Sequence, residues 1–427
     1  MPRWKRNAII LCLAQLLTLT GFSSYFSFIP FYIQELGVSD YQEVLSWLAT
    51  FSSGAAVAMM FSAPLWGSLA DRYGRKMMLI RATAAGAILA FLMGLAQSPL
   101  QLVILRILQG AFCGTVSASL TMVTTETPEE HLGMWLGMMQ TTQFVGHAVG
   151  PLIGGLAADA FGYRTVFTIS SIMMALSVTM VTFLVKERFQ PRKKTARSAS
   201  GRERIATLLT RSTVALLLLL GSVRFATAVL SPILSLYVQS LSADATRIAT
   251  LAGAVTSVAA ITCSLSALAI GRLGDKLSQK AVLIVCSVGL ALLQIPQAFV
   301  SSASQLLIWR ALQGVFYGGT MPTANALLAK STPSSRRGTI FGLATSVMAG
   351  GRALGPIVGA GVAGAWGMPS VFLVTAAAFA VISAIAGFMV KVTPQANGVP
   401  MERAPTQETE ALSAPHRACK VPRPPGS

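Results

Sequence analysis

Charged side chains are scarce in this sequence. Only 11% of its 427 residues are Asp, Glu, Lys or Arg, whereas 53% are hydrophobic. A water-soluble domain carries a charge on roughly a quarter of its residues. The composition therefore excludes an ordinary soluble protein and favours one that lies in a lipid bilayer.

Acidic residues are scarcer than basic ones, and none lies inside a long apolar run. Each of the 15 Asp and Glu residues falls at the end of such a run, in a loop or in the C-terminal tail. Five arginines nevertheless fall within or at the edge of apolar runs. Arg81 lies near the start of its run, and Arg106, Arg224, Arg310 and Arg352 lie farther inside theirs. A charge buried in a membrane is costly unless it faces a cavity or a partner. We therefore expect each of the last four to line a polar cavity or to bind backbone carbonyls.

Cysteine is also rare and shows no pattern. Four of the five cysteines lie in apolar runs and one lies in the tail, at Cys12, Cys113, Cys263, Cys286 and Cys419. Their spacing fits neither a metal site nor a disulfide framework, so we interpret them as small apolar packing residues. A nucleotide-binding motif is missing as well. We predict no metal, no cofactor, no use of ATP and no enzymatic activity.

Twelve long apolar runs follow one another along the chain. A helix needs about 20 mostly apolar residues to span a bilayer, and in lipid a helix satisfies its own backbone groups. We predict an all-α membrane protein with twelve transmembrane helices, at residues 8–34, 44–66, 77–97, 100–124, 132–158, 164–185, 212–238, 248–270, 281–300, 303–329, 338–363 and 369–390.

Basic residues gather on one side of these predicted helices. If both termini are cytoplasmic, the cytoplasmic segments hold 26 of the 33 Lys and Arg, and the outer loops hold only Arg164 and Arg247. This asymmetry orients membrane proteins and predicts an inner-membrane protein with both termini in the cytoplasm. The net charge of +18 then indicates contact with anionic lipid, not with nucleic acid.

The sequence contains a duplicated six-helix unit. Three pairs of segments share a shift of 204 or 205 residues: Leu102–Gly110 with Leu306–Gly314, Gly150–Pro151 with Gly355–Pro356, and Tyr32–Gln34 with Tyr237–Gln239. An even number of helices gives both copies the same topology, related by an axis along the membrane normal. We predict two pseudo-symmetric six-helix bundles.

The predicted bundles occupy residues 1–186 and 212–391. Between them, residues 187–211 form a basic cytoplasmic linker, and residues 392–427 form a polar, Pro-rich tail that we expect to be disordered. The first apolar run has no small-residue cleavage site, so we expect it to be retained as the first transmembrane helix.

Three motifs indicate a family. Gly67–Lys76 (GSLADRYGRK) resembles the loop motif between the second and third helices of the Major Facilitator Superfamily, and Leu102–Gly110 resembles its fourth-helix motif. The fifth helix is similar to the motif of exporters, with the spacing G-x8-G-x3-GP-xx-GG at Gly137, Gly146, Gly150, Pro151, Gly154 and Gly155. The chain as a whole resembles the 12-span drug:proton antiporters, in particular the MdtG-type multidrug exporters of bacteria.

The resemblance implies a gate at the cytoplasmic side. Asp71 and Arg75 are four residues apart, a spacing that favours an ion pair on one helical face. Glu126, at the end of the fourth helix, matches the acidic position that pairs with this arginine in the family. We expect Asp71, Arg75 and Glu126 to form an inner latch that closes when the central cavity faces outward. The alternative is that the motif only makes a tight turn.

A glycine face runs along the fifth predicted helix. Gly146, Gly150 and Gly154 recur every four residues, and small residues let another helix approach closely. Pro151 removes one backbone hydrogen bond and is expected to kink the helix. This face either serves packing alone or also forms a tight seal that opens and closes during transport.

Two groups are candidates for moving protons. Arg106 occupies a position that the family ties to proton movement, and the usual titration range of a histidine makes His147 a candidate proton carrier. Glu35 and Glu126 are the available acidic partners. The plain alternatives are backbone hydrogen bonding for the arginine and helix packing for the histidine.

The remaining candidate residues come from helices that line the pathway in the family or carry the buried arginines. They are Tyr25, Gln109, Arg224, Arg310, Gln313, Tyr317 and Arg352, with Phe28 and Phe316 as apolar contacts. We predict a monomeric secondary transporter that exports drug-like amphipathic compounds in exchange for protons by alternating access. A cavity with arginines and no acid favours neutral or anionic substrates. Two other hypotheses are a dedicated exporter of a sugar or organic-acid metabolite and a non-transporting membrane sensor.

Overall fold

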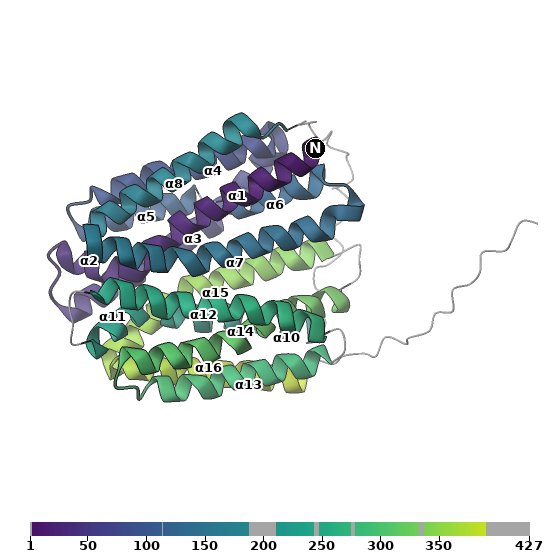
Figure 1. Cartoon of the computed structure of the whole chain (residues 1–427). Helices are drawn as coiled ribbons and strands as arrows, with labels where there is room; N and C mark the ends of the chain where they lie inside the picture. Colours follow the sequence, from purple (N-terminus) through teal and green to yellow (C-terminus); the bar gives the residue numbers. More distant parts are fainter. Residues whose placement is uncertain are drawn as a thin grey trace, which may run out of the picture. The chain divides into compact units, whose positions relative to one another are not determined.

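The computed structural model describes residues 2–112, 114–187, 211–242, 247–274, 278–332 and 337–389, and the elements among them are all helical (Figure 1). They are α1 (Arg3–Ser24), η1 (Phe26–Phe28), α2 (Ile29–Glu35), α3 (Tyr41–Tyr73), α4 (Arg75–Gly94), α5 (Pro99–Ala111), α6 (Thr115–Glu126), α7 (Glu129–Phe161), α8 (Tyr163–Leu184), α10 (Arg211–Leu230), α11 (Ile233–Leu241), α12 (Ile248–Gly274), α13 (Gln279–Gln297), α14 (Ala303–Ser331), α15 (Arg337–Trp366) and α16 (Met368–Met389). The predicted all-α class is confirmed. Most of the predicted linker and the whole predicted tail lie outside the described residues.

Within this part of the chain, 11 helical segments are long and apolar enough to span a bilayer. The tenth predicted helix, α14, has 29 residues but is more polar, because it carries Arg310, Gln313 and Asn325. Three of the apolar runs are broken: the first around η1, the fourth between α5 and α6, and the seventh between α10 and α11. Hydropathy does not reveal these breaks, since apolar side chains continue through them.

Matching hydrogen bonds reveal the duplication. Ser98 and Ser302 each begin a helix by accepting a bond from the backbone N–H three residues later, at 3.4 and 3.3 Å. The Tyr32 hydroxyl donates to a carbonyl near the end of α4 at 3.1 Å, and the Tyr237 hydroxyl donates to one at the end of α13 at 3.0 Å. These pairs stand 302 − 98 = 204 and 237 − 32 = 205 residues apart, as the sequence repeat predicts.

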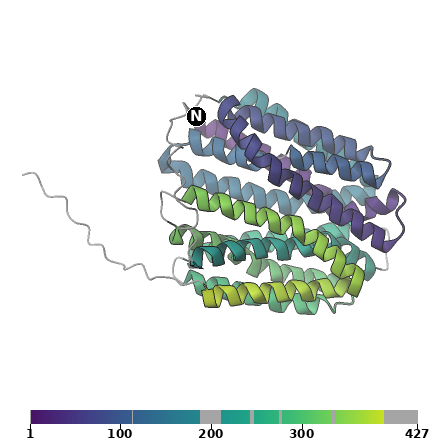
Figure 2. The ribbon, with the colours of Figure 1, turned by 180° about the vertical axis from the view of Figure 1, so that it is seen from behind.

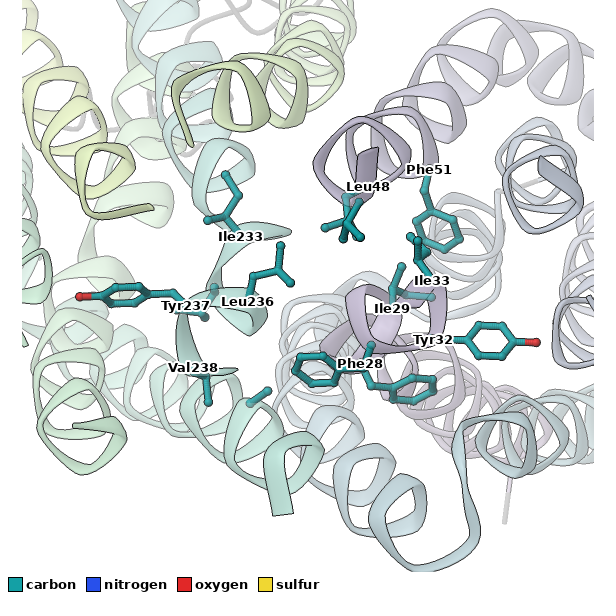
Figure 3. Close-up of a cluster of buried hydrophobic side chains, with 14 of the residues drawn as sticks. Phe28, Ile29, Tyr32, Ile33, Leu48, Phe51, Ile233, Leu236, Tyr237 and Val238 are labelled. Atoms are coloured by element: carbon teal, nitrogen blue, oxygen red, sulfur yellow. The ribbon is translucent and has the colours of Figure 1, made fainter. Parts of the chain in front are cut away.

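One hydrophobic core joins the two halves, and two others do not. The joint core contains Phe28 and Phe51 of the first half with Ile233 and Leu236 of the second (Figure 3). One separate core draws on residues 8–185 and the other on residues 215–386. We call the end with the joint core the sealed end, and the opposite end, where α1 begins, the N-terminal end.

Helices of the two halves meet along two seams. α7 lies against α12 (Figure 1), and α3 lies against α15 (Figure 2). Several side chains of α3 between Val44 and Ala55 are buried, whereas none of its described side chains beyond Ala55 is buried. On the side of the α3–α15 seam, α3 is therefore more deeply buried at the sealed end than toward the N-terminal end.

The motif Gly67–Lys76 is a helix break rather than an extended loop. α3 continues into the motif and α4 begins at Arg75, so Gly74 alone separates the two helices, with a φ of 92°. Glycine adopts this backbone conformation without a steric penalty. Asp71 and Arg75 therefore belong to different helices, and the expectation that they share one helical face is wrong.

Candidate functional site

Three predicted residues meet in the middle of the first half. Tyr25 directly follows α1, whereas Arg106 and Gln109 lie three residues apart on α5 and so share a face. The Arg106 guanidinium donates to Gln109 Oε1 at 2.6 Å and to the Tyr25 hydroxyl at 3.4 Å. The Tyr25 hydroxyl donates to the same Gln109 oxygen at 2.9 Å. All three side chains are buried, so they form one internal polar network.

Aromatic rings surround the charge of Arg106. Its guanidinium carbon lies 4.9 Å from the ring centroid of Phe22, 4.8 Å from that of Phe26 and 5.2 Å from that of Phe51. Ring faces attract a cation without neutralising it. The sequence supplies no acid inside the apolar runs, so the groups found around the Arg106 guanidinium are neutral: Gln109, the Tyr25 hydroxyl and the three phenyl rings.

The second half holds a related cluster. The Arg310 guanidinium donates to Gln313 Oε1 at 2.9 Å, and the Gln297 amide donates to the same oxygen at 3.2 Å. Tyr317 lies close enough to Arg224 and Arg310 for their charges to act on its hydroxyl. The fold thus gathers four of the predicted cavity residues, and it adds Gln297, which the motifs did not indicate.

His147 lies near arginines of the opposite half. It belongs to α7, and the charges of Arg224 on α10 and Arg352 on α15 act on its ring. The side chains of His147 and Arg352 are exposed although both lie within membrane-spanning helices, whereas Gly146 and Ala148 are buried. The ring of His147 in the first half therefore lies within the electrostatic influence of two arginines of the second half.

The glycine face of α7 packs directly on α1. A Cβ atom would clash with α1 at each of the three predicted positions, Gly146, Gly150 and Gly154. Gly155 instead faces α12 of the second half, whereas Gly137 has open space around it. α7 runs as a single helix through Pro151. The export-type motif thus has members on two interfaces, one within the first half and one between the halves.

Glu126, a predicted latch residue, contacts α1 in this conformation. Its Oε2 accepts a hydrogen bond from the Asn7 side-chain amide at 2.6 Å. Its Oε1 is buried and has no hydrogen-bond partner among the described residues. Arg75 is near enough for its charge to act on this carboxylate. The side chain of Asp71, the third predicted latch residue, lies outside what the structure describes.

Glu187 holds the start of α4. Its two carboxylate oxygens accept hydrogen bonds from the backbone N–H groups of Arg75 and Lys76, at 3.0 and 2.9 Å. The first N–H groups of a helix have no partner within it, and the positive end of the helix dipole attracts a carboxylate. Neither Glu187 nor Asn7 was predicted, because each meets its partner through more than 100 intervening residues.

Among the described residues, three polar contacts join the two halves at the sealed end. The side-chain amides of Gln34 and Gln239 bond to each other at 3.2 and 3.4 Å. The Gln42 amide donates to the Gly364 carbonyl at 2.9 Å. Asp159 accepts from two backbone N–H groups in the first turn of α12. The sequence contains an indirect signal for the first of these contacts, because Gln34 and Gln239 occupy equivalent positions in the two repeats.

Comparisons with known proteins agree with this architecture. The family model of the Major Facilitator Superfamily matches residues 11–251 and 216–417. Multidrug resistance protein MdtG of Escherichia coli (strain UMN026) is 34% identical over 375 residues, which are 87% of this chain and 91% of that protein. MdtG of Salmonella arizonae is 35% identical over 374 residues, which are 87% of this chain and 92% of that protein.

Solved structures share the fold at low sequence identity. A bacterial homologue of the human lysosomal transporter Spinster, in an inward-facing and occupied conformation, has a TM-score of 0.76 at 14% identity, covering 92% of this chain and 99% of that one. A D-xylose–proton symporter has a TM-score of 0.71 at 17% identity, covering 91% of this chain and 98% of that one.

Proposed function

The chain belongs to the Major Facilitator Superfamily and is a multi-pass membrane transporter rather than an enzyme, and from that premise we propose that it exports drug-like amphipathic compounds in exchange for protons. The relatives that cover most of this chain are named multidrug resistance proteins, which supports a drug-like substrate. The protein works as a monomer in the inner membrane, with its basic segments against anionic lipid.

The distribution of the hydrophobic cores is the observation that best supports transport by alternating access. The halves share a core at the sealed end and keep separate cores toward the N-terminal end. Alternating access requires a protein that closes at one end while it opens at the other. In our proposal the sealed end faces the outside and both termini face the cytoplasm, so this conformation takes up substrate from the cell.

The charge of the central residues supports a preference for neutral or anionic substrates. His147, Arg224 and Arg352 come from both halves, and Arg106 and Arg310 add two further positive charges. The apolar runs contain no acidic residue in their interior, so these positive charges would repel a cationic substrate. An anionic group would instead accept charge-assisted hydrogen bonds from arginines of both halves.

Proton coupling is assigned to Arg106 and His147. The network of Arg106, Gln109 and Tyr25 lies in the first half, and His147 lies at the seam with the second. Each proton that moves inward across 100 mV supplies about 2.3 kcal/mol. We further propose that Asp71, Arg75 and Glu126 form the inner latch, which is assembled when the cavity faces outward. In our proposal the latch is released when the cavity faces inward, and Glu126 then binds Asn7, as it does in this structure.

Everted membrane vesicles provide the test. Vesicles from cells that produce the protein are given an acid interior, and a fluorescent pH probe follows the gradient while single compounds are added. Neutral and anionic amphipathic drugs should collapse the gradient, and cationic dyes should not. Vesicles without the protein are the control. Transport of a labelled compound without any proton movement would exclude antiport, and a response to one sugar or organic acid alone would favour a dedicated metabolite exporter.

A further inference from the structure

Asp159 of α7 binds the beginning of a helix in the opposite half. Its two carboxylate oxygens accept hydrogen bonds from the backbone N–H groups of Thr250, at 2.7 Å, and Ala249, at 3.3 Å. Both N–H groups belong to the first turn of α12, where they have no partner within the helix. A carboxylate on the positive end of a helix dipole forms charge-assisted hydrogen bonds.

The position of Asp159 is unfavourable in its own helix. It lies in the last turn of α7, which ends at Phe161. A negative charge near a helix C-terminus is destabilising, because the dipole is negative there. The local sequence therefore gives no reason for an acid at this position. The first turn of α12 offers the opposite end of a dipole, so the contact between the halves accounts for the residue.

Backbone packing fixes the geometry of this contact. A Cβ atom at Gly155, one turn before Asp159, would clash with the backbone of Ala249. A Cβ atom at Gly253 would clash with the Pro151 carbonyl. α7 and α12 thus touch backbone to backbone at the sealed end. This close approach places the carboxylate of Asp159 directly against the first turn of α12.

We infer that Asp159 is the latch of the sealed end, a gating residue whose bonds to α12 must break before the protein opens on that side. The two other polar contacts there, Gln34 with Gln239 and Gln42 with Gly364, are between neutral groups. Charge-assisted hydrogen bonds are roughly twice as strong as neutral ones. Asp159 therefore contributes most to the polar attraction that these three contacts provide, and it sets the balance between the two conformations.

Distances between the two halves test this role. The full-length protein, with its five native cysteines replaced, carries spin labels at Gln97 and Ser301, which are exposed at the sealed end, one in each half. Pulsed electron paramagnetic resonance in lipid nanodiscs reports the populations with a closed and an open sealed end. We expect Asp159→Ala to raise the ratio of open to closed about tenfold, which corresponds to about 1.4 kcal/mol.

Asp40→Ala is the matched control. The Asp40 carboxylate accepts a hydrogen bond from the Glu43 backbone N–H at 2.9 Å, which is also a contact with the first turn of a helix, but within one half. This variant should leave the distance distribution unchanged. Asp159→Asn keeps the shape of the side chain and removes its charge, and it should give a smaller shift in the same direction as Asp159→Ala.

The outcomes separate this inference from the proposed function on which it rests. A sealed end that never opens, in any variant or with any substrate, contradicts alternating access itself. A sealed end that opens equally in the wild type and in both Asp159 variants overturns the latch alone. A latch stabilises one of two folded states, so failure of both variants to accumulate as folded protein also overturns it.

Discussion

Replacement of Arg106 by methionine separates a structural role from a role in coupling. The side chain is 5% exposed and makes one short hydrogen bond to Gln109, so about 2 kcal/mol is lost with that bond. The contacts with three phenyl rings contribute on the order of 2–3 kcal/mol together. Against this loss, a guanidinium no longer has to be taken out of water, which costs several kcal/mol per ion.

These terms nearly cancel for the Arg106→Met variant. Methionine fills much of the same volume, and the Tyr25 hydroxyl keeps its 2.9 Å bond to Gln109, so neither polar group loses its partner. We expect the free energy of unfolding to change by less than about 2 kcal/mol in either direction, while proton-coupled export falls at least about tenfold. The melting temperature in detergent and the decay of the pH gradient in everted vesicles measure the two effects.

The neighbouring Ile104 provides the control. It lies on the same helix, it is 49% exposed, and Ile104→Met should change neither stability nor transport. Normal export by Arg106→Met at a normal amount of protein would refute the assignment of coupling to this residue. Complete loss of folded protein would instead refute the balance of energies given above, because it would show that the network of Arg106 cannot be replaced by apolar packing.

Three further predictions concern the glycine face, the inner latch and the start of α4. Gly154→Ala places a Cβ atom against the backbone of α1 and should destabilise the protein by about 1–3 kcal/mol, whereas Gly137→Ala, in open space, should not; equal melting temperatures would contradict the packing. Asp71→Asn should reach the membrane in normal amounts but lose most transport, and normal transport would remove the inner latch. Glu187→Ala leaves two N–H groups of α4 without their acceptor and should lower the free energy of unfolding by about 1–2 kcal/mol. An unchanged melting temperature would show that water replaces the carboxylate.

The duplication and the helices could be predicted from the sequence because both leave local signals. Apolar runs of sufficient length require membrane helices, and the shared shift that relates Arg106 to Arg310 and Tyr32 to Tyr237 appears again in their hydrogen bonds. Part of the cluster of Arg106, Gln109 and Tyr25 could be predicted from a local signal as well. A helical spacing of three residues places the first two on one face.

The contacts between distant segments could not be predicted in the same way. Glu187 reaches α4 across 112 residues of sequence, and no periodic pattern encodes such a pairing. The break at Gly74 places Asp71 and Arg75 on different helices, whereas a continuous helix would have placed them on one face. Asp159 did leave a signal, since an acid in the last turn of a helix contradicts the dipole preference. Such a residue is a reason to look for a second helix.

The most direct test of alternating access measures distances at both ends of the same protein. Spin labels at Gln97 and Ser301 report the sealed end, and labels at Thr124 and Ser331, exposed near the ends of α6 and α14, report the N-terminal end. Alternating access predicts opposite changes in the same membranes: the distance at the sealed end increases in the population in which the distance at the N-terminal end decreases. Distances that rise together, or a transporting protein in which neither distance changes, would contradict it.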